Sequence, residues 1–158
     1  MKVLRTIVLV MAFLATTVPI AHLLELPTKL TLEGPLWLSI QQNLYRGWNT
    51  VFTPIEILAL LGSSLLFFLS KNDRHRSSYL IAAICYVAMI LYFFLFNDLV
   101  NNTLSKWTAA TLPHDWAAYR LKWETGHVLA AVFSLVAFAA LLQARIREEA
   151  SPATGAFE

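Results

Sequence analysis

Hydrophobic residues in this chain gather into four long runs that are separated by more polar stretches. The runs cover about residues 3–24, 51–70, 79–97 and 127–143. A helix needs about 20 apolar residues to cross the hydrocarbon core of a bilayer, and each run approaches that length. The last run is short, but the stretch after Pro113 contains no helix breaker until Gly126, so we expect a longer helix that starts in the preceding loop. The pattern predicts an all-α protein, a bundle of four transmembrane helices.

The segment between the first two runs predicts an additional helix at the membrane interface. Gly34-Pro35 is a favourable helix start. After it, polar residues occupy one helical face and apolar residues the opposite face. The polar face consists of Ser39, Gln42, Asn43 and Arg46, and the apolar face of Leu36, Trp37, Ile40, Leu44 and Trp48. An amphipathic helix of this kind lies in the interface with its tryptophans at headgroup depth, and we expect it to cap the bundle from the first outer loop.

Basic residues favour one orientation of the bundle. Seven of the 12 lysines and arginines fall on one predicted side: Lys2, Arg5, Lys71, Arg74, Arg76, Arg145 and Arg147. Because basic residues are enriched on the cytoplasmic side, we expect both termini there, in the inner membrane of a bacterium. Residues 1–147 are expected to form a single membrane domain, and residues 148–158 a disordered cytoplasmic tail. The first run is longer than a signal-peptide core, which favours a retained helix over a cleaved one.

Composition excludes other classes of protein. Of the 158 residues, 58% are hydrophobic and 14% are charged, a balance that is typical of a membrane domain. The net charge is only +2 and the basic residues are dispersed, so no nucleic-acid partner is expected. Cys85 is the single cysteine, which excludes an intramolecular disulfide and a paired-thiol metal site. The small-residue row Gly126, Ala130 and Ser134 would let a helix approach closely, within the bundle or in a homo-oligomer.

Polar and ionisable side chains gather at the outer ends of the four runs. They are His22 and Glu25, Glu56, Asn97 and Asp98, and Glu124 and His127. Such groups are costly near hydrocarbon and usually face the interior of a bundle. The pairs His22–Glu25 and Glu124–His127 are spaced i, i+3, so the members of each pair project from one helical face. The distribution predicts a shared polar site near the outer membrane face.

This polar layer is compatible with several kinds of site. Helix bundles that bind two metal ions use Glu-x-x-His on two helices and a Glu from each of two others, a pattern that His22, His127, Glu25 and Glu56 match in part. A haem ligated by His22 and His127 from facing helices is a second option, and a site without a cofactor is a third.

The acids also have structural interpretations. Thr53-Pro54-Ile55-Glu56 has the form of a capping box in which Thr53 is the N-cap. Glu124 lies four residues after Arg120 and could form a local ion pair with it, and Glu25 could be an interfacial acid.

Aromatic residues surround the polar layer. An aromatic and basic face precedes the fourth run, and phenylalanines end the third run: Trp116, Tyr119, Arg120, Trp123 and His127 in the first group, Phe93, Phe94 and Phe96 in the second. These side chains could line a pocket for a flat apolar molecule, or form an aromatic belt at the interface.

Four segments carry a resemblance to a known family. They are A-H-L-L-E-L-P-T-K-L at 21–30, Q-Q-N-L-Y-R-G-W at 41–48, N-D-L-V-N-N at 97–102 and H-D-W-A-A-Y-R-L-K-W-E-T-G-H at 114–127. With these segments the chain resembles the anthrone oxygenase-like family of small four-helix membrane proteins, largely classed as a domain of unknown function. The most specific part is the pattern of Asp115, Trp116, Arg120, Trp123, Glu124 and His127.

The resemblance implies chemistry without an added cofactor, in which a base forms a substrate carbanion that reacts directly with oxygen. His127 or His22 would then be the base, and Trp116, Trp123 or Asn101 would position the substrate. Arg120 would stabilise an enolate.

The leading hypothesis is a membrane-embedded oxidoreductase or oxygenase-like enzyme that acts on a small apolar, aromatic molecule. Its catalytic candidates are His22, His127, Glu124 and Arg120, and its substrate-binding candidates are Trp116, Trp123, Asn97, Asn101 and Tyr45. A haem- or metal-binding protein for electron transfer or sensing is the first alternative, and a non-enzymatic accessory subunit is the second. Transport is disfavoured because the cytoplasmic halves of the runs lack ionisable side chains.

Overall fold

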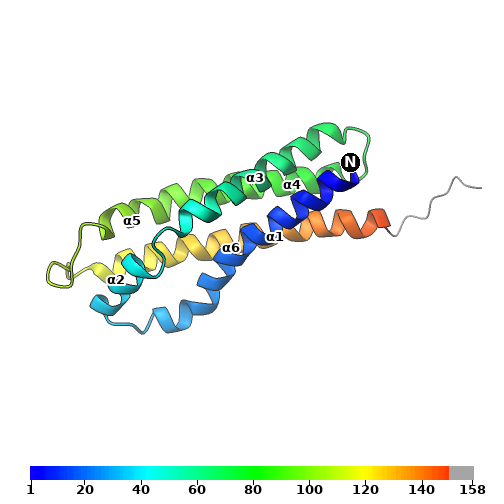
Figure 1. The fold of residues 1–158 in the computed structure, drawn as a ribbon. Coiled ribbons are helices and arrows are strands. Elements are labelled where there is room, and N and C mark those ends of the chain that lie inside the picture. Colours follow the sequence, from blue (N-terminus) through cyan, green and yellow to red (C-terminus); the bar gives the residue numbers. More distant parts are fainter. Residues whose placement is uncertain (150–158) are drawn as a thin grey trace, which may run out of the picture.

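The computed structural model describes residues 1–149 and is helical throughout its regular elements (Figure 1). The elements are α1 (Lys2–Lys29), α2 (Gly34–Asn43), α3 (Trp48–Leu69), α4 (Arg76–Tyr92), the π-helix η1 (Phe93–Asp98), α5 (Leu99–Leu104) and α6 (Trp116–Glu149). Of the predicted tail, residues 150–158 lie outside the described residues, whereas residues 148 and 149 belong to the last turn of α6.

Four helical segments are long and apolar enough to cross a membrane. They are Lys2–Lys29, Trp48–Leu69, Arg76–Leu104, in which α4, η1 and α5 follow one another, and Trp116–Glu148. The predicted all-α bundle of an integral membrane protein is therefore confirmed. Each span exceeds its predicted length, and α6 starts eleven residues before the short fourth run, as the absence of a breaker after Pro113 predicted.

The four spans pack in a ring in which α1 contacts α3 and α6, and α4 contacts the same two helices. Alanines with exposed fractions of 0 to 1% lie at these contacts on all four spans, for example Ala12, Ala59, Ala82 and Ala137. Small side chains let helices approach closely where lipid supplies no hydrophobic driving force. Large apolar side chains such as Phe13, Leu61 and Val87 point outward and remain exposed for lipid. The first and last spans, which each carry a candidate histidine, are consequently neighbours.

One end of the bundle collects charged side chains. Here the N-terminus, the α3–α4 loop and the end of α6 meet (Figure 1). Arg5 forms ion pairs with Asp73 and Glu148, and Arg74 donates a hydrogen bond to the carbonyl of Arg147. These contacts join the ends of α1 and α6 to the α3–α4 loop. The basic residues that were predicted to share one side thus gather at one end.

The opposite end is closed by α2, as predicted for the first outer loop. Gln42 Nε2 donates to the carbonyls of Leu104 and Trp107, at 2.8 and 2.9 Å, which fastens α2 to the end of the third span. The predicted division of faces was partly wrong. Trp37 is 0% exposed rather than at headgroup depth. The helix ends at Asn43, so Trp48 belongs to α3 and takes no part in the face.

The predicted capping box at Thr53 was also wrong. Helix α3 begins at Trp48, and its N-cap is Gly47 with a φ of 83°, a left-handed conformation that favours glycine. Thr53 and Glu56 therefore lie inside the helix, together with Pro54. Because the turn at Gly47 starts the helix earlier than the local signature indicated, Glu56 does not cap a helix end.

Candidate functional site

A cavity of about 640 Å³ lies beneath α2, between the α2-side ends of the four spans. It is lined by residues from every span and from the α2–α3 connection. Its polar lining consists of His22, Gln41, Gln42, Tyr45, Arg46, Asn49, Thr53, Glu56, Asn97, Asn101, Ser105 and His127, and its aromatic lining includes Trp48, Phe52, Phe93, Trp107 and Trp123. The volume falls in the range of about 300–1,000 Å³ that is typical of small-molecule sites.

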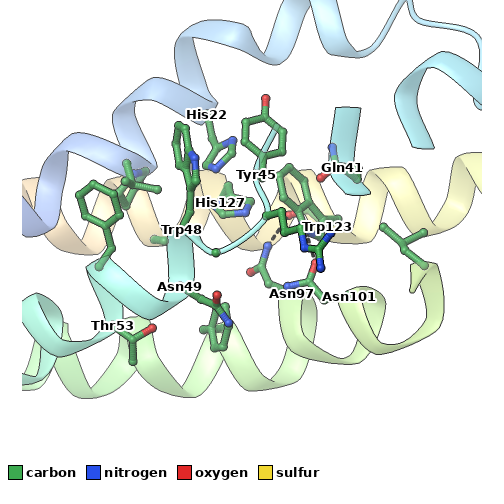
Figure 2. A pocket seen from close by; sticks show the side chains of 18 of the residues that line it. His22, Gln41, Tyr45, Trp48, Asn49, Thr53, Asn97, Asn101, Trp123 and His127 are labelled. Atoms are coloured by element: carbon green, nitrogen blue, oxygen red, sulfur yellow. Dashed lines mark hydrogen bonds between the residues drawn. The ribbon is translucent and has the colours of Figure 1, made fainter. Parts of the chain in front are cut away.

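Two histidines from the neighbouring helices α1 and α6 meet in this cavity. The ring centroids of His22 and His127 are 3.9 Å apart with an interplanar angle of 39°. Trp123 contacts both rings, with centroids 5.0 Å from His22 and 4.1 Å from His127. Figure 2 shows the imidazoles between Trp48 on one side and Trp123 on the other. The predicted convergence of residues 22 and 127 is thus what the structure shows.

A buried lysine, which the sequence-based interpretation missed, organises the charges beside the histidines. Lys29 lies in the last turn of α1 and its side chain is 4% exposed. Its Nζ lies 3.1 Å from His22 Nδ1, 3.0 Å from Glu124 Oε2 and 3.6 Å from Glu25 Oε2. Lys29 occupies position i+7 from His22 and i+4 from Glu25. If the first helix is extended to residue 29, this spacing predicts that the three side chains share one helical face.

Tyr45 links this charge cluster to the cavity. Its hydroxyl donates a hydrogen bond of 2.6 Å to Glu25 Oε2, and its ring contacts His22 edge-on with centroids 4.6 Å apart. Burial raises the pKa of Tyr45, and the adjacent Glu25 carboxylate raises it further. The hydroxyl therefore stays protonated and continues to donate at neutral pH.

Asparagines of the third span place amides in the cavity. Asn97 is buried in the π-helix η1 and donates from Nδ2 to the carbonyl of Trp123 at 2.9 Å. Asn101 Oδ1 accepts a hydrogen bond of 2.8 Å from Trp123 Nε1. The amide N–H groups of Asn101 have no hydrogen-bond partner in residues 1–149. A π-helix inserts one extra residue per turn and is common at functional sites. No signal in the apolar sequence of η1 predicted it.

Four predicted site residues do not line the cavity: Glu25, which is bound by Tyr45, and Trp116, Arg120 and Glu124. Arg120 donates from Nη1 to the carbonyls of Lys29 and Leu32, at 3.1 and 2.8 Å, and its guanidinium lies over the ring of Trp116. Trp116 in turn packs on Trp37 in a hydrophobic cluster beside the cavity. Glu124 is 2% exposed and faces Lys29. The local ion pair between Arg120 and Glu124 is not formed, because both side chains reach across to the end of α1.

The geometry distinguishes among the cofactor options. In the part of the chain that the structure describes, no three His, Cys, Asp or Glu side chains are grouped so that they could hold a metal ion. Of the four predicted metal ligands, Glu25 is engaged by Tyr45, and the Lys29 ammonium lies against His22. Two axial haem ligands stand on opposite sides of the porphyrin, whereas the rings of His22 and His127 are in direct contact. The pair as it stands suits proton transfer better than ligation.

Comparisons with known proteins agree with these observations. A family model described as anthrone oxygenase matches residues 42–140, more than half of the chain. No curated protein and no solved structure matches. The matched range contains His127, Trp123 and the three cavity asparagines, and it leaves out α1 with His22 and Lys29. The chain is therefore an integral membrane protein that belongs to the anthrone oxygenase family.

Proposed function

We propose that this protein is a membrane-embedded oxygenase that converts an anthrone-like substrate, a flat aromatic ketone with a reactive methylene group, into the corresponding quinone. The observation that carries the proposal is the contact between His22 and His127 in an aromatic-walled cavity of about 640 Å³. The family match supports the oxygenase class.

The proposed reaction needs a base and a place for oxygen. A histidine removes a proton from the methylene carbon, and the negative charge spreads onto the ketone oxygen as an enolate. The carbanion adds to O2 and forms a peroxide anion, which takes up a proton and becomes a hydroperoxide. Loss of water from the hydroperoxide leaves a second carbonyl. One O2 is consumed: one oxygen atom enters the quinone and the other leaves as water.

The cavity walls suit this substrate. Trp48, Trp123 and Phe93 supply flat apolar surfaces against which aromatic rings pack. The free amide N–H groups of Asn101 can donate to the ketone oxygen and stabilise the enolate charge. In this arrangement Asn101 takes the role that the family resemblance suggested for Arg120.

Oxygen consumption by the purified protein tests the proposal. Wild-type protein in detergent or nanodiscs is mixed with anthrone, and O2 uptake and quinone absorbance are followed together after subtraction of uncatalysed oxidation. His22→Gln and His127→Gln remove the proposed proton-transfer groups, and each should lower kcat by about 10²–10⁴-fold. His114→Gln is the matched control, since His114 is exposed and lies outside the cavity. A wild-type rate equal to the uncatalysed rate, or full activity of the doubly substituted protein, would contradict the proposal.

We propose the following orientation: the cavity opens at the periplasmic face of a bacterial inner membrane, and both termini lie in the cytoplasm, with residues 1–147 as a single domain. The supporting observation is the gathering of Arg5, Arg74 and Arg147 at the end opposite α2. Labelling of single cysteines, introduced at exposed Lys71 or Ser105 in a Cys85→Ser background, tests the orientation in intact cells. An impermeant thiol reagent should label position 105 only, and the reverse result would overturn it.

A further inference from the structure

We infer that Lys29 is a positioning residue that fixes the tautomer of His22, so that the two histidines have different roles: His22 donates a hydrogen bond from Nε2, and His127 accepts a proton. The catalytic part of this inference rests on the proposed oxygenase function, whereas the tautomer of His22 can be tested without it.

The hydrogen-bond chemistry of Lys29 leads to the tautomer. A charged ammonium donates three hydrogen bonds and accepts none. Lys29 Nζ lies 3.1 Å from His22 Nδ1, which must therefore be an unprotonated acceptor. Glu25 Oε2 also approaches Nδ1, but at 3.5 Å it lies beyond normal hydrogen-bond length and already accepts from Tyr45. A neutral ring with an unprotonated Nδ1 carries its proton on Nε2, and this N–H is what His22 offers to the cavity.

The side chains around Lys29 hold its ammonium group against His22. Glu124 is buried opposite it, with Oε2 at 3.0 Å from Nζ. The ring of Trp123 lies under the ammonium, 4.9 Å from Nζ to the centroid. Buried ion pairs are poor stabilisers compared with apolar packing. A pair that is buried here and also contacts a cavity histidine is better explained by its effect on that histidine.

Helix α6 holds the end of α1 at a second point. Arg120 lies one turn before Glu124 on α6 and binds the backbone carbonyls of Lys29 and Leu32. The backbone of residue 29 is thereby fixed by Arg120 and its side chain by Glu124. Together these contacts set the position of Nζ against His22.

His127 has a different environment. Its ring contacts His22 and Trp123, and its nitrogens have no hydrogen-bond partner in the described part of the chain. No cation donates to it, so a ring nitrogen is free to accept the methylene proton of a substrate. His22 Nε2–H can then donate a hydrogen bond to the peroxide intermediate, and protonated His127 returns the methylene proton to it. The asymmetry follows from one ammonium group that touches one of two otherwise similar rings.

Nitrogen-15 NMR of the full-length protein, labelled at histidine and held in detergent micelles at neutral pH, tests the tautomer directly. The His22 signals are assigned by comparison with His22→Gln. We expect the proton on Nε2 in wild-type protein, and a shift towards the other tautomer in the Lys29→Met/Glu124→Gln double variant. This double variant removes both charges, so that neither is left buried alone. Lys122→Met/Glu33→Gln makes the same two changes at exposed positions and should leave the spectrum of His22 unaltered. A wild-type His22 protonated on Nδ1, or as an imidazolium, would overturn the inference even if the double variant failed to fold.

Turnover of anthrone tests the division of roles. Lys29→Met/Glu124→Gln should lower kcat by about tenfold or more, with KM changed less than about threefold, because substrate contacts remain while the hydrogen-bond donor to the peroxide is misplaced. An unchanged kcat, or a loss confined to KM, would overturn the positioning role. If wild-type protein does not oxidise anthrone, the proposed function fails, and the NMR result still decides the tautomer.

Discussion

Gly126 connects the last span to the π-helix that carries Asn97, and its replacement by alanine tests that connection. A Cβ at position 126 would overlap Asn97 Oδ1 and lie 2.8 Å from Asn97 Cγ and 2.9 Å from Phe96 Cβ. Carbon atoms in contact normally stand about 3.5–4.0 Å apart. Because Phe96 Cβ is attached directly to the backbone, η1 must move away from α6 in the Gly126→Ala variant.

Three terms set the expected loss of stability. Overpacking of this kind costs about 1–3 kcal/mol. Displacement of Asn97 weakens its hydrogen bond to the Trp123 carbonyl, which in a membrane contributes about 0.6 and at most about 1.7 kcal/mol. Alanine regains about 1 kcal/mol over glycine through helix propensity. We therefore expect a net destabilisation of about 1–4 kcal/mol.

Unfolding of the micelle-bound protein in sodium dodecyl sulfate, followed by circular dichroism, measures this change. Ala139→Gly in the same helix is the control, since Ala139 faces outward and the variant reports propensity alone. Anthrone turnover should fall as well in Gly126→Ala, because the cavity wall at Asn97 moves. A Gly126→Ala protein that is as stable as wild type would refute the close approach of η1 and α6.

Further predictions concern Glu56, His75 and Arg120. Glu56 lines the cavity and has no hydrogen-bond partner among the described residues, so Glu56→Gln should raise KM about tenfold for hydroxylated anthrones relative to the unsubstituted compound; equal KM ratios would contradict this role. Burial lowers the pKa of His75, with Arg74 acting in the same direction and Asp73 against it. As pH falls below about 6.5, this imidazole is therefore protonated in the unfolded chain before it is protonated in the folded protein, and the free energy of unfolding should fall by at most about 1.4 kcal/mol per pH unit. Thermal melts of His75→Gln should show a smaller decrease over the same pH range. Arg120→Gln removes charged donors from two carbonyls and should cost about 1.5–3 kcal/mol for each bond, measured by the same detergent-unfolding experiment; an unaltered midpoint would rule out the role in holding α1.

Run length and charge placement were sufficient to predict the four spans and the polar layer at one end of the bundle. Both properties act locally: a segment of about 20 apolar residues enters hydrocarbon whatever its neighbours are. The same holds for His22 and His127, which were recognised by their matching depth. The family resemblance carried by residues 97–102 and 114–127 lies within the region of the family match.

Helix boundaries were less predictable. The first apolar run ended at about residue 24 and Thr53-Pro54 suggested a helix start, yet α1 continues to Lys29 and α3 begins at Trp48. Tertiary contacts can extend a helix beyond the position at which a local signal predicts its end. The hydrogen bond from Arg120 to the carbonyl of Lys29 at the end of α1 is such a contact. The burial of Lys29 was missed for this reason.

The sequence by itself determined how many times the chain can cross a membrane and which end of the bundle carries polar chemistry, because apolar length and charge are properties of each segment alone. The partners of each charge were decided only by the tertiary structure. Glu124 and Arg120 are spaced to bind each other, but both bind the end of α1, because α1 and α6 pack side by side. Asn97 of the π-helix at Phe93–Asp98 likewise packs closely against Gly126 of α6. Such contacts join residues far apart in the chain, and no local pattern records them.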